Sequence, residues 1–190
     1  MHARARLAAV TMTAILALTA CSGGSTVTDT PKDVPAAKST PKTPASKPAA
    51  PKVAKVGDTI ALVGAEDGSE LDVTVVKVAD PAKSSDEFTA PDAGNRWIGV
   101  QFQLLNTGTA AYNDSPGNGV KIADSQGQQF TSVFADITAG PSMGSSVTLK
   151  PGAKALGWIV FEVPKESKGA VVQFTMDSGF ADQTGEWALS

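Results

Sequence analysis

Residues 97 to 105 alternate between apolar side chains and polar residues or glycine, and this period of two leaves little choice of local structure. One face of the segment is apolar and consists of Ile98, Val100, Phe102 and Leu104. The opposite face consists of Gly99, Gln101 and Gln103. Because successive side chains of a β-strand point to opposite faces of a sheet, the pattern predicts a half-buried strand.

Similar apolar segments recur throughout residues 53 to 190. Those expected to form strands are 59–63, 71–78, 120–123, 129–134, 159–163, 171–176 and 186–189. Turn signals separate them, such as Lys150-Pro151-Gly152, in which proline sets φ near about −65° and glycine accepts the positive φ that follows. No segment has a convincing helical pattern, and residues 80–95 are expected to form a surface loop. About seven to nine short strands in one domain predict an all-β fold, an antiparallel β-sandwich over residues 53–190.

The first 20 residues have the order of a secretory signal. Two arginines precede an apolar run over residues 7–18, and small residues precede Cys21. The run of about 12 residues is shorter than the about 20 that span a bilayer.

Residues 18–21, Leu-Thr-Ala-Cys, resemble the lipobox of bacterial lipoproteins. This resemblance implies removal of a signal peptide (1–20) before Cys21 and a covalent diacylglycerol on its thiol. The protein would then be anchored on the extracytoplasmic face of the cell membrane; the alternative is an ordinary signal peptide whose cleavage site contains a cysteine.

The segment after Cys21 has the composition of a linker. Residues 22–52 are rich in Pro, Ala, Lys, Ser and Thr and lack hydrophobic periodicity. Proline removes backbone donors, and such a composition cannot bury enough apolar surface to offset the entropy lost on ordering. Residues 21–52 are therefore predicted to be the lipidated cysteine and a disordered tether with a coil size of roughly 30 Å. The excess of lysine in this tether is interpreted as serving solubility. The alternative is that these lysines contact anionic lipid or wall polymer.

Short motifs follow one another along the domain. They are VGDTI at 56–60, WIGVQF at 97–102 with NTG at 106–108, IADSQG at 122–127, LKPG at 149–152 and GWIVFEVP at 157–164. In order and spacing they resemble the telokin-like, immunoglobulin-like domain of bacterial surface lipoproteins, over nearly all of residues 56–177. The resemblance implies an immunoglobulin-like antiparallel β-sandwich behind a lipobox and a low-complexity tether. This family is known as a domain of unknown function and implies no catalytic residues.

Residue types needed for common catalysis are missing from the domain. Cys21 is the only cysteine, and His2, the only histidine, lies in the predicted signal peptide. Ser-His-Asp and Cys-His catalysis, zinc sites of His and Cys, and haem ligation by these residues are therefore excluded. Chemistry with two carboxylates remains possible, but among about 17 acids some pair is inevitable and indicates nothing. We expect a protein that is not an enzyme and that has no cofactor besides the covalent lipid.

Acidic residues dominate the charge of the domain. Residues 53–190 contain about 9 Lys and Arg against about 17 Asp and Glu, a net charge near −8 that would repel nucleic acid. One cluster in a loop and the strand after it consists of Glu66, Asp67, Glu70 and Asp72. Such oxygens build extracytoplasmic calcium sites, so the cluster is a candidate calcium site; the alternative is that it serves solubility.

Three aromatic residues are candidates for ligand binding. Trp97, Trp158 and Tyr112 could stack on sugar rings or anchor a partner protein, whereas the alternative for the tryptophans is a place in the core. Tyr112 lies in a polar loop and is expected to be the most exposed. Trp158 shares a strand face with Leu156 and Val160, so either a loop covers this second apolar face or a ligand binds there.

The hypothesis that these features favour is a non-enzymatic, lipid-anchored β-sandwich outside the cytoplasmic membrane. It would bind an envelope protein or a cell-wall glycan or other wall component. The alternative is a surface module that binds a small ligand or calcium.

Overall fold

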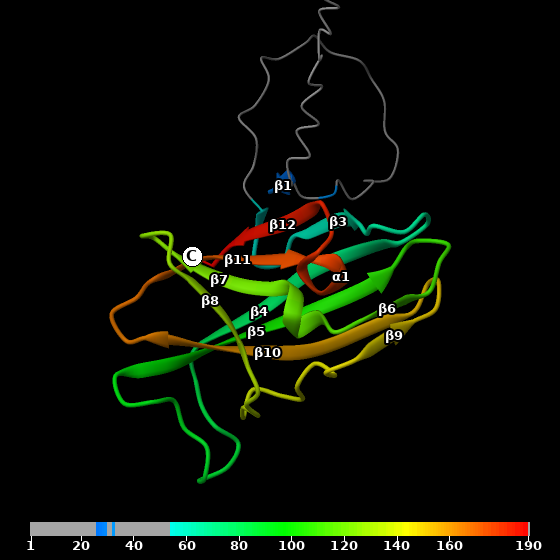
Figure 1. The fold of residues 1–190 in the computed structure, drawn as a ribbon. Coiled ribbons are helices and arrows are strands. Elements are labelled where there is room, and N and C mark those ends of the chain that lie inside the picture. The colour runs from blue at the N-terminus through cyan, green and yellow to red at the C-terminus, as the bar shows by residue number, and fades with distance from the viewer. Residues whose placement is uncertain (1–25, 30–31, 33–53, 190) are drawn as a thin grey trace, which may run out of the picture.

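The alternating segments form the strands of a two-layered β-sandwich, so the predicted fold class is confirmed (Figure 1). The structure, a computed structural model, describes residues 26–29, 32 and 54–189. The predicted signal peptide, Cys21 and most of the predicted tether lie outside the described residues. No helix among the described residues is long and apolar enough to cross a bilayer.

Each strand predicted from the pattern is present, together with short elements that the pattern did not predict. The strands are β1 (Thr26–Thr28), β2 (Ala54–Lys55), β3 (Thr59–Val63), β4 (Glu70–Ala82), β5 (Asn95–Asn106), β6 (Tyr112–Asp114), β7 (Val120–Asp124), β8 (Gln129–Val133), β9 (Val147–Leu149), β10 (Lys154–Pro164), β11 (Gly169–Thr175) and β12 (Gln183–Ala188). A 3₁₀ turn, η1 (Pro116–Gly119), and one helical turn, α1 (Met176–Gly179), complete the chain.

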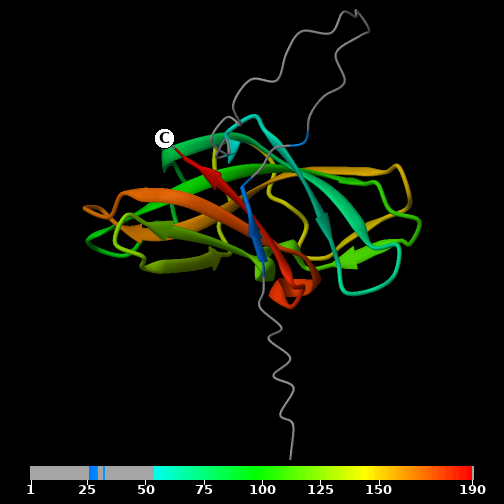
Figure 2. The same cartoon turned by 90° about the horizontal axis from the view of Figure 1, so that it is seen from above.

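One path of paired strands runs through both layers in the order β1-β12-β11-β7-β8-β10-β5-β4-β3, with β6 and β9 paired separately. β8 joins the layers, because its first residues pair with β7 whereas Ser132 and Val133 pair with β10. At the other side of the sandwich, the Val63 N–H of β3 donates to the Gln183 side chain of β12 at 2.9 Å. Figure 2 shows the two layers from above.

The main core lies between the two layers. β5 contributes the apolar face predicted from its alternation, and Phe102 on that face is fully buried. Its ring packs against Phe174 of β11 in the opposite layer, with the ring centroids 5.7 Å apart. Trp187 of β12 is also fully buried and donates its indole N–H to the Asp58 carbonyl at 3.0 Å. Burial of these large rings from both layers stabilises the sandwich.

A second, smaller cluster lies on the outer face of β5 and β10. It consists of Ala82, Trp97, Ile137, Trp158 and Val160. A loop over residues 134–142 covers it, with the Ile137 side chain only 3% exposed. Gly99 makes room for that side chain, since a Cβ there would lie 2.6 Å from Cδ1 of Ile137. Of the two alternatives for the second apolar face at Trp158, the structure shows the covering loop.

Part of the predicted disordered tether is a strand. β1 pairs in parallel with β12, with Thr26 opposite Gln183. The Lys32 ammonium contacts both carboxylate oxygens of Asp72, at 2.6 and 2.9 Å. The prediction of disorder is therefore wrong for these residues. Composition misses such a strand because its ordering depends on the unpaired edge of β12, which lies more than 150 residues further along the sequence.

The turns form largely as the sequence predicted. Gly152 has a φ of 80°, and the Ala153 N–H donates to the Lys150 carbonyl at 2.9 Å, as in a type II turn. α1 departs from the expectation of a chain without helix. Its Asp177 and Ser178 both have a φ of 55°, which is rare for residues other than glycine.

Candidate functional site

A cleft of about 890 Å³ opens beside β8 where that strand diverges from β10. Trp158, Ile159 and Val160 of β10 form its floor. Residues 131–136 line one wall and residues 142–146 the other, and side chains around η1 and the loop after β4 contribute to the rim. A hollow of this size falls in the range of about 300–1,000 Å³ that is typical of ligand pockets.

The walls of the cleft are held by backbone hydrogen bonds. The Trp158 N–H donates to the Pro141 carbonyl at 3.0 Å, and the Met143 N–H donates to the Trp158 carbonyl at 2.7 Å. The Thr138 N–H donates to the Lys83 carbonyl at 2.9 Å, which ties the wall to the loop after β4. These bonds also occupy the outer edge of β10, so the cleft presents side chains rather than an open strand edge.

Trp158 has a polar group that the fold does not satisfy. Its side chain is 5% exposed, and its Nε1 is the one buried side-chain nitrogen or oxygen without a hydrogen-bond partner in the part of the chain that the structure describes. The nitrogen faces Gly140, where a Cβ would approach it to 2.9 Å. An unmet buried N–H costs about 1–3 kcal/mol, so this one calls for an oxygen that the described residues do not supply.

Hydroxyl groups dominate the polar lining. They belong to Thr89, Ser115, Thr131, Ser132, Ser142, Ser145 and Ser146. Three are fixed by the protein: Ser132 Oγ donates to the Gly117 carbonyl at 2.7 Å, Ser142 Oγ to Asp136 Oδ1 at 2.6 Å, and Thr89 Oγ1 to Asp86 Oδ1 at 2.9 Å. Ser145 and Ser146 are exposed on the wall of the cleft. Hydroxyls both donate and accept, so this surface matches ligands that are themselves rich in hydroxyls or amides.

Two phenylalanine rings are exposed at this end of the molecule. Phe134 lines the cleft and is 98% exposed. Phe88 is 89% exposed in the loop after β4, between the lining residues Asp86 and Thr89. Asp86 shapes that loop, because its Oδ1 accepts from the Thr89 hydroxyl at 2.9 Å and from the Phe88 N–H at 2.8 Å. These hydrogen bonds, that from the Thr89 side chain foremost, lower the pKa of Asp86, so it is ionised at neutral pH.

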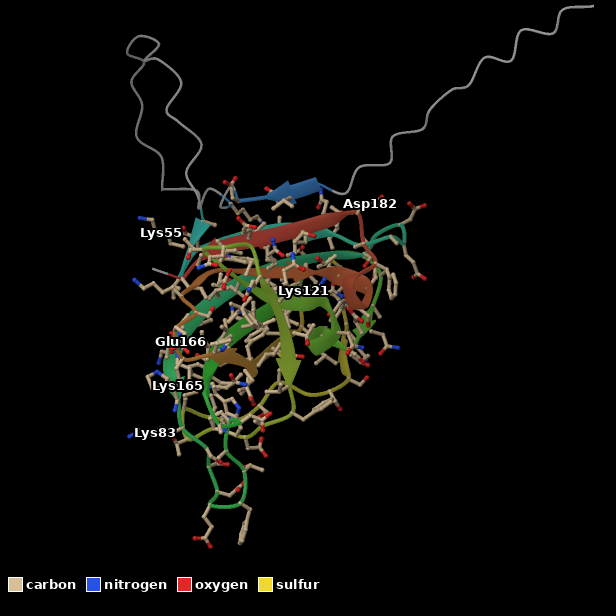
Figure 3. The ribbon with its side chains drawn as sticks, turned by 60° about the vertical axis from the view of Figure 1, so that its left-hand side comes forward. Lys55, Lys83, Lys121, Lys165, Glu166 and Asp182 are labelled. Atoms are coloured by element: carbon tan, nitrogen blue, oxygen red, sulfur yellow. The ribbon has the colours of Figure 1, made fainter. Side chains whose placement is uncertain are left out.

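The charged groups of the lining are both acids. They are Asp86 and Asp136, and no described residue that lines the cleft is a lysine or arginine. Figure 3 labels Lys83, Lys121 and Lys165, none of which lines the cleft. The charge of the lining is therefore unfavourable for anionic ligands.

Glu162 fixes the outer cluster on the side away from the covering loop. Its Oε2 accepts the Trp97 indole N–H at 3.0 Å, and its Oε1 accepts from the Asn95 amide at 2.8 Å and the Asp92 N–H at 2.9 Å. The bond from Asn95 is the largest cause of a lowered pKa of Glu162; burial opposes it, and the bonds from Trp97 and the Asp92 N–H lower the pKa further. The carboxylate thus joins β5, β10 and the end of the loop after β4.

The structure corrects the expectation for two of the aromatic candidates. Tyr112, expected to be exposed, is 4% exposed because β6 pairs with β9 and turns its ring into the main core. Its hydroxyl donates to Asp114 at 3.2 Å, and burial raises its pKa. Trp97 is 4% exposed in the outer cluster, so neither ring is available to stack on a ligand. Trp158 is equally buried, but it forms part of the cleft floor.

The four acids of the candidate calcium site do not converge. Glu66 and Asp67 are exposed in the turn after β3, and Glu70 is exposed at the start of β4. Asp72 is paired with Lys32. Nowhere in residues 26–29, 32 and 54–189 does a group of three or more His, Cys, Asp or Glu side chains come close enough to hold a metal ion. The described structure therefore does not bring these four residues together, because charge in a turn does not imply convergence.

Sequence reasoning missed most residues of the cleft. The serines at 142, 145 and 146 lie between predicted strands and carry no periodicity. Phe134 was predicted as the last residue of a strand, but β8 ends at Val133 and the ring projects into solvent. The one signal that could have found the cleft is the second apolar face at Trp158, since such a face needs a covering segment or a ligand.

Comparison with known proteins places the domain in a family. No curated protein matches the chain. Among the solved structures that share the fold, two align over most of their own length. The first is the secreted protein MPT63 from Mycobacterium tuberculosis, with 19% identity and a TM-score of 0.50 over 70% of this chain and 94% of that one. The second is the yjhA protein from Bacillus subtilis, with 16% identity and a TM-score of 0.51 over 73% of this chain and 100% of that one. A family profile matches residues 65–185, and the chain therefore belongs to the family described as DUF4352, a domain of unknown function.

Proposed function

We propose that the protein is a lipid-tethered extracytoplasmic module that binds an envelope partner or wall component in the cleft and does not catalyse a reaction. The observation that carries the proposal is Phe134, whose ring is 98% exposed beside a preformed cleft with a buried apolar floor. A preformed hollow with an apolar floor is the default place for a ligand, and an exposed aromatic ring beside it can serve as an anchor for that ligand.

The arrangement of the two ends supports an outward-facing cleft. β1 and β12 lie at one end of the molecule, where the chain enters the domain from the segment that follows Cys21 (Figure 1). The loop after β4, which contributes to the cleft, lies at the opposite end, and Figure 3 likewise separates Lys55 of β2 from Lys83 at the start of that loop. A lipid on Cys21 would thus leave the cleft facing away from the bilayer.

Two further observations support the location and the absence of catalysis. The signal sequence with its lipobox-like end implies export and lipidation, and the protein MPT63, which shares the fold, is a secreted protein. The serines of the cleft have no histidine to activate them, because His2 is the only histidine of the chain.

The lipid anchor can be tested directly. Mass spectrometry of the membrane fraction should find a mature chain that begins at Cys21 and carries a diacylglycerol. A Cys21→Ala variant should lose this modification and leave the membrane fraction. A mature chain with a free thiol at Cys21 would contradict the lipid anchor and would leave the binding proposal unaffected.

The binding proposal is tested with a matched pair of variants. A soluble chain from Ser22 to Ser190 is sedimented with the purified envelope fraction of the producing bacterium. Phe134→Ser should weaken the affinity for the envelope fraction by about tenfold or more, as expected when an anchor worth at least 1.4 kcal/mol is lost. Phe180→Ser is the control, because Phe180 is 86% exposed but lies outside the cleft. Equal retention of both variants would refute binding through the cleft.

A further inference from the structure

We propose that the ligand of the cleft is an uncharged oligosaccharide of the cell envelope. This inference rests on the proposed function and specifies the chemical class of its ligand. It follows from three properties of the cleft: the hydroxyl-rich walls, the exposed aromatic ring at the rim and the absence of cationic side chains.

The walls match a sugar chain better than they match a peptide. An extended peptide is bound most simply by adding a strand to an open sheet edge. Here the outer edge of β10 is occupied, since Trp158 already bonds to Pro141 and Met143, and Val160 is paired with Val133 of β8. What the walls offer instead are side-chain hydroxyls such as those of Ser145 and Ser146.

The apolar parts of the cleft fit the same ligand class. A pyranose ring has an apolar C–H face and hydroxyls around its edge, so it packs flat on an aromatic ring while its edge hydrogen-bonds to neighbouring groups. Phe134 supplies an exposed ring, and the neighbouring wall supplies hydroxyls. An apolar helix would need a broad hydrophobic groove, whereas the floor residues Trp158, Ile159 and Val160 are at most 6% exposed.

The charges of the lining exclude the anionic polymers of an envelope. Asp86 and Asp136 are the charged side chains among the described lining residues, and both would repel phosphate or carboxylate groups.

The test measures affinity by calorimetry with the soluble chain from Ser22 to Ser190. The neutral probes are the tetramer of N-acetylglucosamine, maltotetraose and a neutral arabinogalactan fragment; the anionic probe is a heparin tetrasaccharide. We expect at least one neutral probe to bind and the anionic probe not to bind.

Binding should weaken by about tenfold or more in Phe134→Ala and in the double variant Ser145→Ala/Ser146→Ala, and should not change in Phe180→Ala. Because the ligand is uncharged, its Kd should change less than about twofold between 0.05 and 0.5 M NaCl.

Each alternative outcome has a distinct meaning. If no neutral probe binds at 10 mM while envelope retention still depends on Phe134, the sugar class is overturned and the proposed function stands. Neutral binding that is insensitive to Phe134 and to both serines overturns the assignment to the cleft. If neither the probes nor the envelope fraction depends on Phe134, both the inference and the proposed function fall.

Discussion

The main core and the outer cluster are buried to a similar degree, but the sequence encodes them in different ways. Phe102 in the main core and Ile137 in the outer cluster are 0% and 3% exposed. Phe102 is one position in a run of alternating residues, and strands of both layers bury it. Ile137 is the one buried apolar residue that an irregular loop contributes to the cluster with Trp158 and Trp97. The core thus follows from a repeating pattern, whereas the outer cluster receives one buried side chain from a loop without a pattern.

This difference separates the residues that stabilise the whole domain from the residues that shape the cleft. The main core holds the two layers together and reaches the cleft only at Ile159 and at Met143, which packs against it. The outer cluster contains Trp158 and Val160 of the cleft floor, and its covering loop continues into the wall at residues 142–146. Substitutions in the core should therefore unfold the whole domain, while those in the cluster should loosen the cleft first.

The largest effect is expected for Phe102→Ala in the main core. Its ring is fully buried and packs on Phe174, so its removal leaves a cavity between the layers. We expect the free energy of unfolding to fall by about 3–5 kcal/mol, measured by urea denaturation. A loss below about 1 kcal/mol would show that the layers do not depend on this contact.

The next effect is expected for Ile137→Ala in the outer cluster. The free energy of unfolding should fall by about 2–3 kcal/mol, at the lower end for a buried isoleucine because the loop can partly collapse onto the gap. Hydrogen exchange should accelerate at residues 138–143 and remain unchanged in β11. Leu156→Ala is the control: this residue lies on the same strand face as Trp158 but is 58% exposed, so we expect a change within about 0.5 kcal/mol. Equal acceleration in β11 would mean that the cluster and the core unfold as one unit.

The contrast also shows which parts of the fold the sequence can predict. Alternation in residues 97–105 predicted β5 and its buried face, because the period of a strand is local. It also located the apolar face at Trp158, but not Ile137, which lies in a short segment without periodicity. Tyr112 was misjudged because its polar neighbours suggested a loop, whereas pairing with β9 more than 30 residues later buries its ring. β1 was missed for the same reason, since a short strand is ordered only by the distant edge it meets.

The candidate site was harder to predict than the fold. The cleft arises where β8 and β10 diverge, and that divergence depends on the pairing of strands about 30 residues apart. The serine-rich segment at 142–146 has no distinguishing composition beyond that of an ordinary loop. Polar lining residues therefore carry meaning only after long-range pairing has placed them around one hollow.

A third prediction tests whether Ile137 and Gly99 form one packed contact. In Gly99→Ala the new Cβ would lie 2.6 Å from Cδ1 of Ile137 and 3.3 Å from the Trp158 ring. Overpacking should lower the free energy of unfolding by about 1–2 kcal/mol. Ile137→Val removes that Cδ1, so the double variant should lose at least about 0.5 kcal/mol less than the sum of the two single variants. Additive losses would show that the covering loop relaxes around the new methyl group independently of Ile137.

The smallest effect is expected for Glu162→Gln, and it should depend on pH. The hydrogen bonds from Asn95 and Trp97 lower the pKa of Glu162 in the folded protein, below the value of about 4.3 in an unfolded chain. The ionised carboxylate therefore stabilises the folded state above pH about 4.3, and this stabilisation is lost as the pH falls through the folded-state pKa. The free energy of unfolding of Glu162→Gln should thus lie below that of the unmodified chain at pH 7 and approach it at pH 3.

Glu87→Gln, at an exposed position of the loop after β4, should show no such convergence. If the free energy of unfolding of Glu162→Gln lies below that of the unmodified chain by the same amount at both pH values, Glu162 acts through its shape and not through its charge.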